Sequence, residues 1–107
     1  MENKIFTLLG FAQKSGNLIT GENTCEIYLK RKQLILLIVS EDASENTVKK
    51  MAGHSKKYNV PLYQFASREE LSIAIGKANR AVIGIKDRGF AKKITELLEQ
   101  LDISAIK

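Results

Sequence analysis

The sequence predicts an α/β fold: a three-layer α/β/α sandwich with a central, mostly four-stranded mixed sheet. Segments with helical spacing of apolar residues alternate with short apolar runs of strand length. The unbroken apolar run at residues 34–39 is typical of a central strand covered on both faces. The connections are short, and 107 residues without a linker or a repeat favour a single domain over residues 1–107.

The first helix is predicted from an apolar stripe, and Gly16 is expected to end it in a left-handed conformation. The stripe has the i, i+3, i+4, i+7 spacing of one helical face and consists of Ile5, Leu8, Leu9 and Ala12. A short strand follows at residues 17–19. Thr20 is then the expected N-cap of a second helix, which ends in a basic run at residues 30–32.

The third helix has two candidate N-caps. Asp42 with Glu45 has the spacing of a capping box, and Ser44 is the alternative cap. The Asn-Val-Pro sequence at residues 59–61 ends this helix, because a residue that precedes proline avoids the helical conformation. A strand at residues 62–65 is expected to follow.

Two helices and one strand are predicted in the remainder of the chain. Ser67 and Glu70 form a capping box for a short helix that Gly76 ends. A buried strand is expected at residues 81–85, and a last helix follows Asp87. The apolar stripe of that helix consists of Phe90, Ile94, Leu97, Leu98 and Leu101.

The composition favours a soluble protein with a polyanionic partner. A net charge of +5 and a pI of about 9.4 favour nucleic acid before membrane, although mild basicity is also common among small soluble proteins. The single cysteine, Cys25, cannot form an internal disulfide and is expected to pack as a small apolar residue. Neither a signal peptide nor a membrane span is present in the sequence, so we expect a cytoplasmic protein without membrane contacts.

The sequence carries no strong signal for catalysis. His54 has no Ser, Cys or Asp at a spacing typical of a nucleophilic triad, and neither a zinc pattern nor a Gly-rich phosphate loop occurs. Glu41 and Asp42 follow a strand and would form a phosphoacceptor site only with Asp87 beside them. Because capping explains Asp42 more simply, we expect no catalytic residue, no metal, no cofactor and no small-molecule substrate.

Two segments are candidates for binding a phosphate backbone. The start of the second helix offers unpaired backbone N–H groups and the positive end of the helix dipole. Its residues are Thr20, Gly21, Glu22, Asn23 and Thr24. The second segment is the polar, basic loop of Lys77, Ala78, Asn79 and Arg80. An ordinary turn and an ordinary surface loop are the alternative interpretations.

The basic run at residues 30–32 adds Lys30 and Arg31 as candidate phosphate contacts, with a solvated helix end as the alternative. A further basic cluster with the same alternative consists of Lys86, Arg88, Lys92 and Lys93. We expect the candidate helix start and the loop at residues 77–80 to meet at one end of the sheet.

The order of these residues resembles the L7Ae/L30e family of kink-turn RNA-binding ribosomal proteins. The resemblance rests on Gly21-x-Asn23, Arg31, the strand at residues 36–39 and the Glu41-Asp42 pair. The segments at residues 60–62 and 70–76 fit the second half of the family. The GFAQKSG and DRGFAKK segments resemble the small bacterial YlxQ-like branch most closely.

The resemblance implies an RNA-binding protein, ribosomal or ribosome-associated, that recognises structured, kink-turn-like RNA. Our first hypothesis is that this protein is non-enzymatic and acts as a monomer. The resemblance also implies that Gly21 and Asn23 meet the sheared G·A pairs of a kink-turn and that the loop at residues 76–80 covers a flipped-out nucleotide. Kink-turn binders of the family carry glutamate and lysine where this chain has Thr24 and Ile27. A protein-interaction module that keeps the fold without RNA binding therefore stays open as the alternative.

Overall fold

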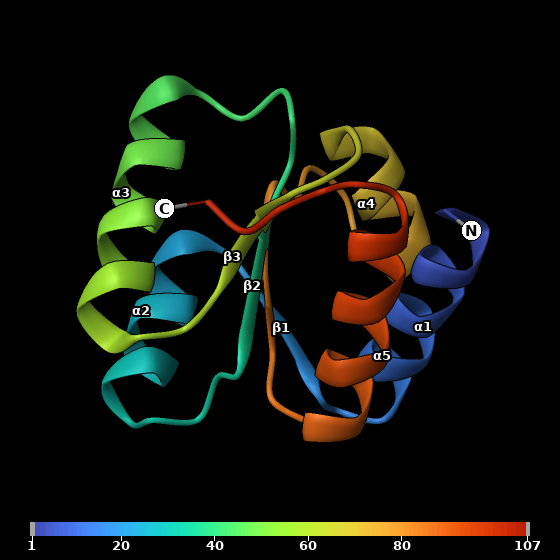
Figure 1. Cartoon of the computed structure of the whole chain (residues 1–107), viewed down its shortest axis with the longest axis horizontal. Helices are drawn as coiled ribbons and strands as arrows, with labels where there is room; N and C mark the ends of the chain where they lie inside the picture. Colours follow the sequence, from blue (N-terminus) through green and yellow to red (C-terminus); the bar gives the residue numbers. More distant parts are fainter. Residues whose placement is uncertain (1, 107) are drawn as a thin grey trace.

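Helices and strands alternate along the chain in the computed structural model, which describes residues 2–106 (Figure 1). The helices are α1 (Glu2–Lys14), α2 (Glu22–Lys30), α3 (Glu45–Tyr58), α4 (Arg68–Ile75) and α5 (Arg88–Gln100). The strands are β1 (Leu18–Thr20), β2 (Leu36–Val39), β3 (Leu62–Gln64) and β4 (Val82–Ile85). The predicted element order is confirmed, and the observed strands differ from their predicted bounds by one or two residues at an end.

The four strands form one mixed sheet in the order β1-β4-β2-β3. Strands β2 and β3 are parallel, whereas β4 runs antiparallel to both β1 and β2. The apolar run predicted as a central strand is β2, which lies between β4 and β3. The mixed, four-stranded α/β fold predicted from the sequence is confirmed.

Helical layers cover both faces of the sheet, with α1, α4 and α5 on one side and α2 and α3 on the other (Figure 1). Successive β2 side chains alternate between the two cores. Leu36 and Ile38 pack with α1 and α5, while Leu37 and Val39 pack with α2 and α3. This is why β2 is apolar without alternation: all four of its residues are buried.

The predicted cap of the second helix is wrong, and of the two candidate caps of the third helix Ser44 is confirmed. Thr20 is the last residue of β1, and the N-cap of α2 is Gly21, at φ 98°. Ser44 rather than Asp42 caps α3, and its hydroxyl accepts the Thr47 N–H at 3.1 Å. Asp42 instead accepts the backbone N–H of Arg68 at 2.9 Å, because β2 and β3 are parallel neighbours and the segments that follow them lie side by side.

One end of the sheet collects the carboxyl ends of β1, β2 and β3 together with the start of β4. Because β4 is antiparallel to β1 and β2, the Gly21 N–H donates to Val82 O at 3.0 Å and the Ser40 N–H donates to Ala81 O at 2.9 Å. We call this end the first rim and define it as residues 20–24, 40–44, 66–70 and 76–82. Helices α2, α3 and α4 all begin there.

The other end of the sheet is the opposite rim, defined as residues 14–18, 30–35 and 85–92. It lies at the bottom of Figure 1, where α1 and α2 end and α5 begins. Asp87 caps α5 there by accepting the Phe90 N–H at 2.9 Å. Asp87 therefore lies at the end of β4 away from Asp42, and the two carboxylates do not form the paired site that a phosphoacceptor would need.

Gly84 in β4 allows α2 to lie close to the sheet. A Cβ atom at this position would come within 2.7 Å of Leu34 Cδ1 and 3.2 Å of Cys25 Sγ. We expect Gly84→Val to lower the free energy of unfolding by roughly 1–3 kcal/mol through overpacking. Urea titration followed by circular dichroism measures the change.

Gly53 in α3 is the matched control, since a Cβ there meets nothing within 4 Å. Gly53→Ala is expected to stabilise the chain by about 0.5–1 kcal/mol, because alanine favours the helix. Equal effects of Gly84→Val and Gly53→Ala would contradict the close approach of α2.

Candidate nucleic-acid interface

The start of α2 has no side-chain cap. Gly21, whose positive φ favours glycine, accepts the Cys25 N–H through its carbonyl at 2.9 Å. The N–H groups of Glu22, Asn23 and Thr24 have no side-chain acceptor among residues 2–106, and both Asn23 and Thr24 are exposed. These N–H groups lie at the positive end of the helix dipole and are available to an anion.

The other two helices that begin at the first rim are capped. Ser44 caps α3, and Ser67 and Glu70 form the predicted capping box of α4, with N–H to oxygen distances of 3.0 and 2.9 Å. The additional bond from the Arg68 N–H to Asp42 further satisfies the α4 start. Among the helix starts at the first rim, only that of α2 is left open.

The loop that precedes β4 is fixed to α4 by Ser72. The Ser72 hydroxyl is buried, accepts the Arg80 N–H at 2.8 Å and donates to Arg68 O at 2.7 Å. Gly76 ends α4 at φ 69°, and Asn79 also has a positive φ of 56°. The loop backbone is therefore held in place from within the fold, while the side chains of Lys77, Ala78 and Asn79 stay exposed.

Two half-buried arginines converge beside the α2 start. Arg68 Nη1 donates to Asn79 Oδ1 at 3.3 Å, which joins the start of α4 to the loop. The Nε atoms of Arg68 and Arg80 are both buried and have no hydrogen-bond partner within the described chain. Both arginines line a hollow of about 220 Å³ that also includes Gly21 and Glu22.

The first rim carries charges of both signs. The cations that line its hollows are Arg68, Lys77 and Arg80, and the carboxylates are Glu22, Asp42 and Glu69. None of these cations has a carboxylate oxygen within 4.0 Å among residues 2–106. Glu41 and Glu70 add two more carboxylates, so the segments that define the first rim carry three cations and five carboxylates. The first rim is therefore not basic, and its donors for an anion are N–H groups without a partner among residues 2–106.

Most of the predicted site residues come together. Gly21, Glu22, Asn79 and Arg80 line one hollow, and Lys77 and Ala78 line an adjoining one of about 470 Å³. Thr20, Asn23 and Thr24 flank Gly21 in the chain and lie at the same rim. The expected meeting of helix start and loop is confirmed as geometry; contact of these residues with RNA stays a prediction.

Lys30 and Arg31 do not belong to this group. They lie at the last turn and C-cap of α2, about 13 Å along the helix axis from its start. Lys30 Nζ is 4.0 Å from Glu26 Oε2, one turn earlier in the helix. The nine-residue helix places these two residues at the opposite rim, apart from Gly21, and their contact with RNA stays a prediction.

Three residues that line the hollows at the first rim were not predicted as site residues. Arg68 has a signal in the sequence, since it follows the cap of a recognised capping box, but its partner Asn79 depends on tertiary contacts. Thr47 donates to Glu22 Oε2 at 3.4 Å and links the starts of α2 and α3. Ile73 is 72% exposed beside Lys77 and provides an apolar surface.

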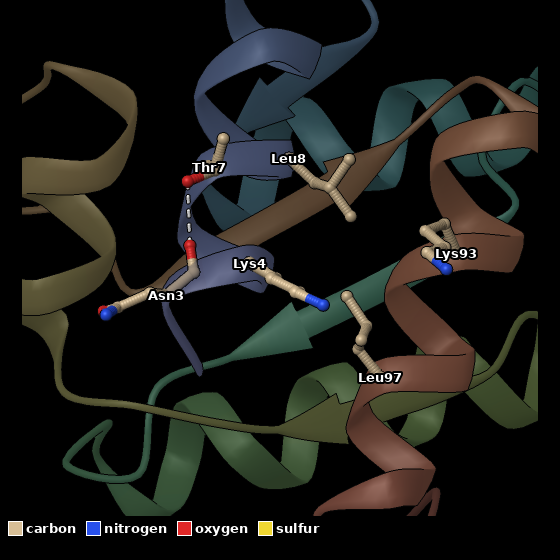
Figure 2. A pocket seen from close by; sticks show the side chains of 6 residues that line it. All are labelled: Asn3, Lys4, Thr7, Leu8, Lys93 and Leu97. Carbon is tan, nitrogen blue, oxygen red and sulfur yellow. Dashed lines mark hydrogen bonds between the residues drawn. The ribbon is translucent and has the colours of Figure 1, made fainter. Parts of the chain in front are cut away.

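Another hollow lies between α1 and α5, outside both rims (Figure 2). Leu8 and Leu97 face each other across it, with Lys4 and Lys93 nearby. The hydrogen bond drawn there runs from Thr7 Oγ1 to Asn3 O at 2.9 Å and closes one turn of α1. This hollow contains no carboxylate, histidine or cysteine in its lining.

Neither a membrane span nor a metal-ligand cluster occurs in the described part of the chain. No helix within residues 2–106 is long and apolar enough to cross a bilayer. No group of three or more His, Cys, Asp or Glu side chains gathers there as a metal site. Cys25 is fully buried as predicted, and burial raises the pKa of its thiol to about 12.

The geometry defines an α/β/α protein that presents an uncapped helix start and a fixed loop at one rim. The chain belongs to the ribosomal protein L7Ae/L30e/S12e/Gadd45 family, whose sequence model matches residues 3–95. The resemblance noted in the sequence, including that to the YlxQ-like branch, is confirmed.

Curated relatives match most of the chain. The RNA-binding protein YlxQ of Enterococcus faecium is 43% identical over 96 residues, which cover 90% of this chain and 92% of that protein. The RNA-binding protein YlxQ of Bacillus subtilis strain 168 is 36% identical over 94 residues, covering 88% of this chain and 94% of its own.

Solved structures show the same fold. A protein of unknown function from Bacillus halodurans C has a TM-score of 0.87 at 38% identity, covering 90% of this chain and 97% of its own. The Giardia lamblia 15.5kD RNA binding protein has a TM-score of 0.78 at 16% identity, covering 94% of this chain and 87% of its own. At that identity the likeness concerns the fold alone.

The Asp42 carboxylate makes stability depend on pH. The Arg68 backbone N–H is the main group that lowers the pKa of Asp42 below its ordinary value near 4. A carboxyl with a lowered folded-state pKa stabilises the fold above its unfolded-state pKa, and the benefit is lost as the pH falls through the folded-state value. We expect Asp42→Ala to lower Tm at neutral pH and to have a smaller effect below about pH 3.

Thermal unfolding of both proteins across this pH range measures the difference. Glu69→Ala is the control, because Glu69 is an exposed carboxylate of the same rim for which no side-chain hydrogen bond occurs within the described chain. A Tm difference between wild type and Asp42→Ala that does not change with pH would contradict the charge-assisted bond.

Proposed function

We propose that this chain binds structured RNA through the first rim, as a non-enzymatic, ribosome-associated protein that acts as a monomer. One observation carries the proposal: the uncapped start of α2 lies beside two half-buried guanidinium groups whose Nε donors have no partner within residues 2–106. Buried polar groups are almost always hydrogen-bonded, to protein, water or a ligand, so these donors suit a ligand that accepts hydrogen bonds. The relatives from Enterococcus and Bacillus subtilis, both named as RNA-binding proteins, support RNA as that ligand.

Each part of the rim has a distinct role in this proposal. The N–H groups at the α2 start bind a phosphate, which suits the positive end of the helix dipole. The exposed Asn23 amide can donate to and accept from a base edge. Arg68 and Arg80 supply planar donors for a second phosphate. Ile73 and Ala78 offer an apolar surface for an unstacked base.

We further propose that the RNA is bent or kink-turn-like. Ile27 is 49% exposed and lies one turn beyond Asn23 on the same helical face. An apolar side chain at that position cannot donate to RNA, as the lysine of the family pattern can. In this proposal Arg68 and Arg80, which lie on the other side of the α2 start, make the charged contacts with RNA that the lysine makes in the family pattern.

Removing two donors from the rim tests the site. We expect Asn23→Ala combined with Arg80→Ala to weaken binding of a kink-turn RNA by roughly 30-fold or more, since each lost contact to a base or phosphate costs about 1–3 kcal/mol. A gel-shift titration at fixed low salt measures the loss. The loop itself should survive, because Ser72 holds Arg80 through its backbone N–H.

Lys4→Ala is the control for this titration, since it removes an exposed cation from the hollow between α1 and α5. Unchanged affinity of the double variant would exclude the first rim as the RNA site. Unchanged circular dichroism of all variants shows that folding is not the cause of a loss.

The salt dependence reports how many phosphates are neutralised. If the chain neutralises about five phosphates, log affinity should fall with log salt at a slope of roughly −4. Fluorescence anisotropy of a labelled RNA at several salt concentrations measures this slope. A flat profile would show that the cations of the chain do not engage nucleic acid, and would favour a partner without phosphates.

A further inference from the structure

The positive charge of the protein is concentrated at the opposite rim. The three segments that define this rim carry seven cations and a single carboxylate, Asp87. The cations are Lys14, Lys30, Arg31, Lys32, Lys86, Arg88 and Lys92. Their excess exceeds the net charge of the whole chain, +5, so the remainder of the protein is close to neutral.

Tertiary contacts bring these segments together around Lys86. The Lys86 N–H donates to Asn17 O at 2.9 Å, and its Nζ donates to Gly16 O at 3.4 Å. The same ammonium group lies 5.4 Å from the centre of the Tyr28 ring in α2. The Ile35 N–H donates to Ile85 O at 2.8 Å. The ends of α1, α2 and β4 therefore form one continuous surface.

The cations of this surface are available to a partner. All except Lys86 are exposed, and among residues 2–106 only Lys30 has a carboxylate oxygen within 4.0 Å. The Asp87 carboxylate is occupied by the Phe90 N–H. Arg88 and Lys92 line a hollow of about 400 Å³ together with Ile35 and Pro61, with Glu96 as its one acidic residue.

Fold stability does not explain where these charges lie. Cations at the end of α2 are favoured by the helix dipole. At the start of α5 the dipole has the opposite sign and disfavours Arg88, and the N-cap Asp87 is the one acidic residue there. Like charges from three segments also repel one another. Such an arrangement costs stability and points to an anionic partner that offsets it.

We propose that the opposite rim binds the phosphodiester backbone of a second RNA segment, apart from the first rim. The large exposed apolar side chains in the described chain are Phe11, Ile27 and Ile73, and none lies in the three segments. The surface thus lacks the apolar anchors of a protein interface, whereas spaced, exposed cations suit a phosphate backbone. The molecule measures 30 × 27 × 26 Å, so an RNA that reaches both rims must extend beyond the first site.

In this proposal the two rims contribute differently to RNA binding. The first rim recognises RNA structure through directed hydrogen bonds, and the opposite rim adds affinity without selecting sequence. The proposal for the opposite rim does not rest on the function proposed for the first rim, because it is argued from the charges and contacts of the opposite rim alone.

A pair of charge-matched variants tests the proposal. Arg31→Gln with Arg88→Gln removes two cations from the opposite rim, and Lys4→Gln with Lys50→Gln removes two exposed lysines from elsewhere. The probes are a labelled kink-turn RNA with long duplex arms and the same RNA trimmed to its internal loop. Anisotropy titrations give affinity and salt slope for each.

We expect the opposite-rim variant to bind the long RNA at least about fivefold more weakly, with a salt slope reduced by about two, and to bind the trimmed RNA unchanged. The control variant should change the affinity for either RNA by less than about twofold. If the opposite-rim variant matches the control with both RNAs, the proposal is overturned, even where an acidic protein is found to bind that surface.

The same titrations with the first-rim variant, Asn23→Ala with Arg80→Ala, distinguish failure of the opposite-rim proposal from failure of the proposed function. Loss of trimmed-RNA binding in the first-rim variant alone supports the site at Gly21. A first-rim variant that binds normally, beside an opposite-rim variant that loses long-RNA affinity, leaves the present proposal standing and overturns the other.

Discussion

The antiparallel placement of β4 between β1 and β2 is the constraint on which the rest of the structure depends. It puts the start of β4 beside the ends of two strands that are far from it in sequence, and the Gly21 N–H to Val82 O bond fixes the register there. The loop before β4 and the start of α2 become neighbours for this reason alone. The same pairing sends the start of α5 to the other end of the sheet, together with the ends of α1 and α2.

A division of charge follows from this topology. The segments of the first rim carry three cations and five carboxylates, and two arginine Nε atoms there are left without partners in the described residues. At the opposite rim the cations are nearly unopposed. Directed donors at one end and diffuse positive charge at the other are the two contributions that nucleic-acid binding requires: position and specificity from the first, affinity and steering from the second.

The fold was predictable because most of its signals are local. The Ser67–Glu70 capping box, the left-handed glycines at 16 and 76 and the apolar β2 each depend on a few neighbouring residues, and each is confirmed. The family resemblance extended this local reading to the whole chain. Strand order was not predictable, because it depends on which apolar edges pair.

The candidate site was predictable only in part, for the same reason. The helix start and the loop were found from turn and charge patterns, but Arg68 was missed because its partner Asn79 lies eleven residues away across a loop. Asp42 was assigned a local cap, whereas the parallel pairing of β2 and β3 gives it the Arg68 N–H. Lys30 and Arg31 lie at the end of α2, as the basic run predicted, and therefore at the rim opposite Gly21.

The Asp42 and Ser72 bonds have a consequence for the kinetics of association. They cross-link the segments of the first rim in the free protein, so its shape is assembled before a ligand arrives. A pre-organised surface loses little conformational entropy on complex formation. Differences in affinity among cognate RNAs should then arise chiefly from residence time, with encounter rates set by long-range electrostatic attraction.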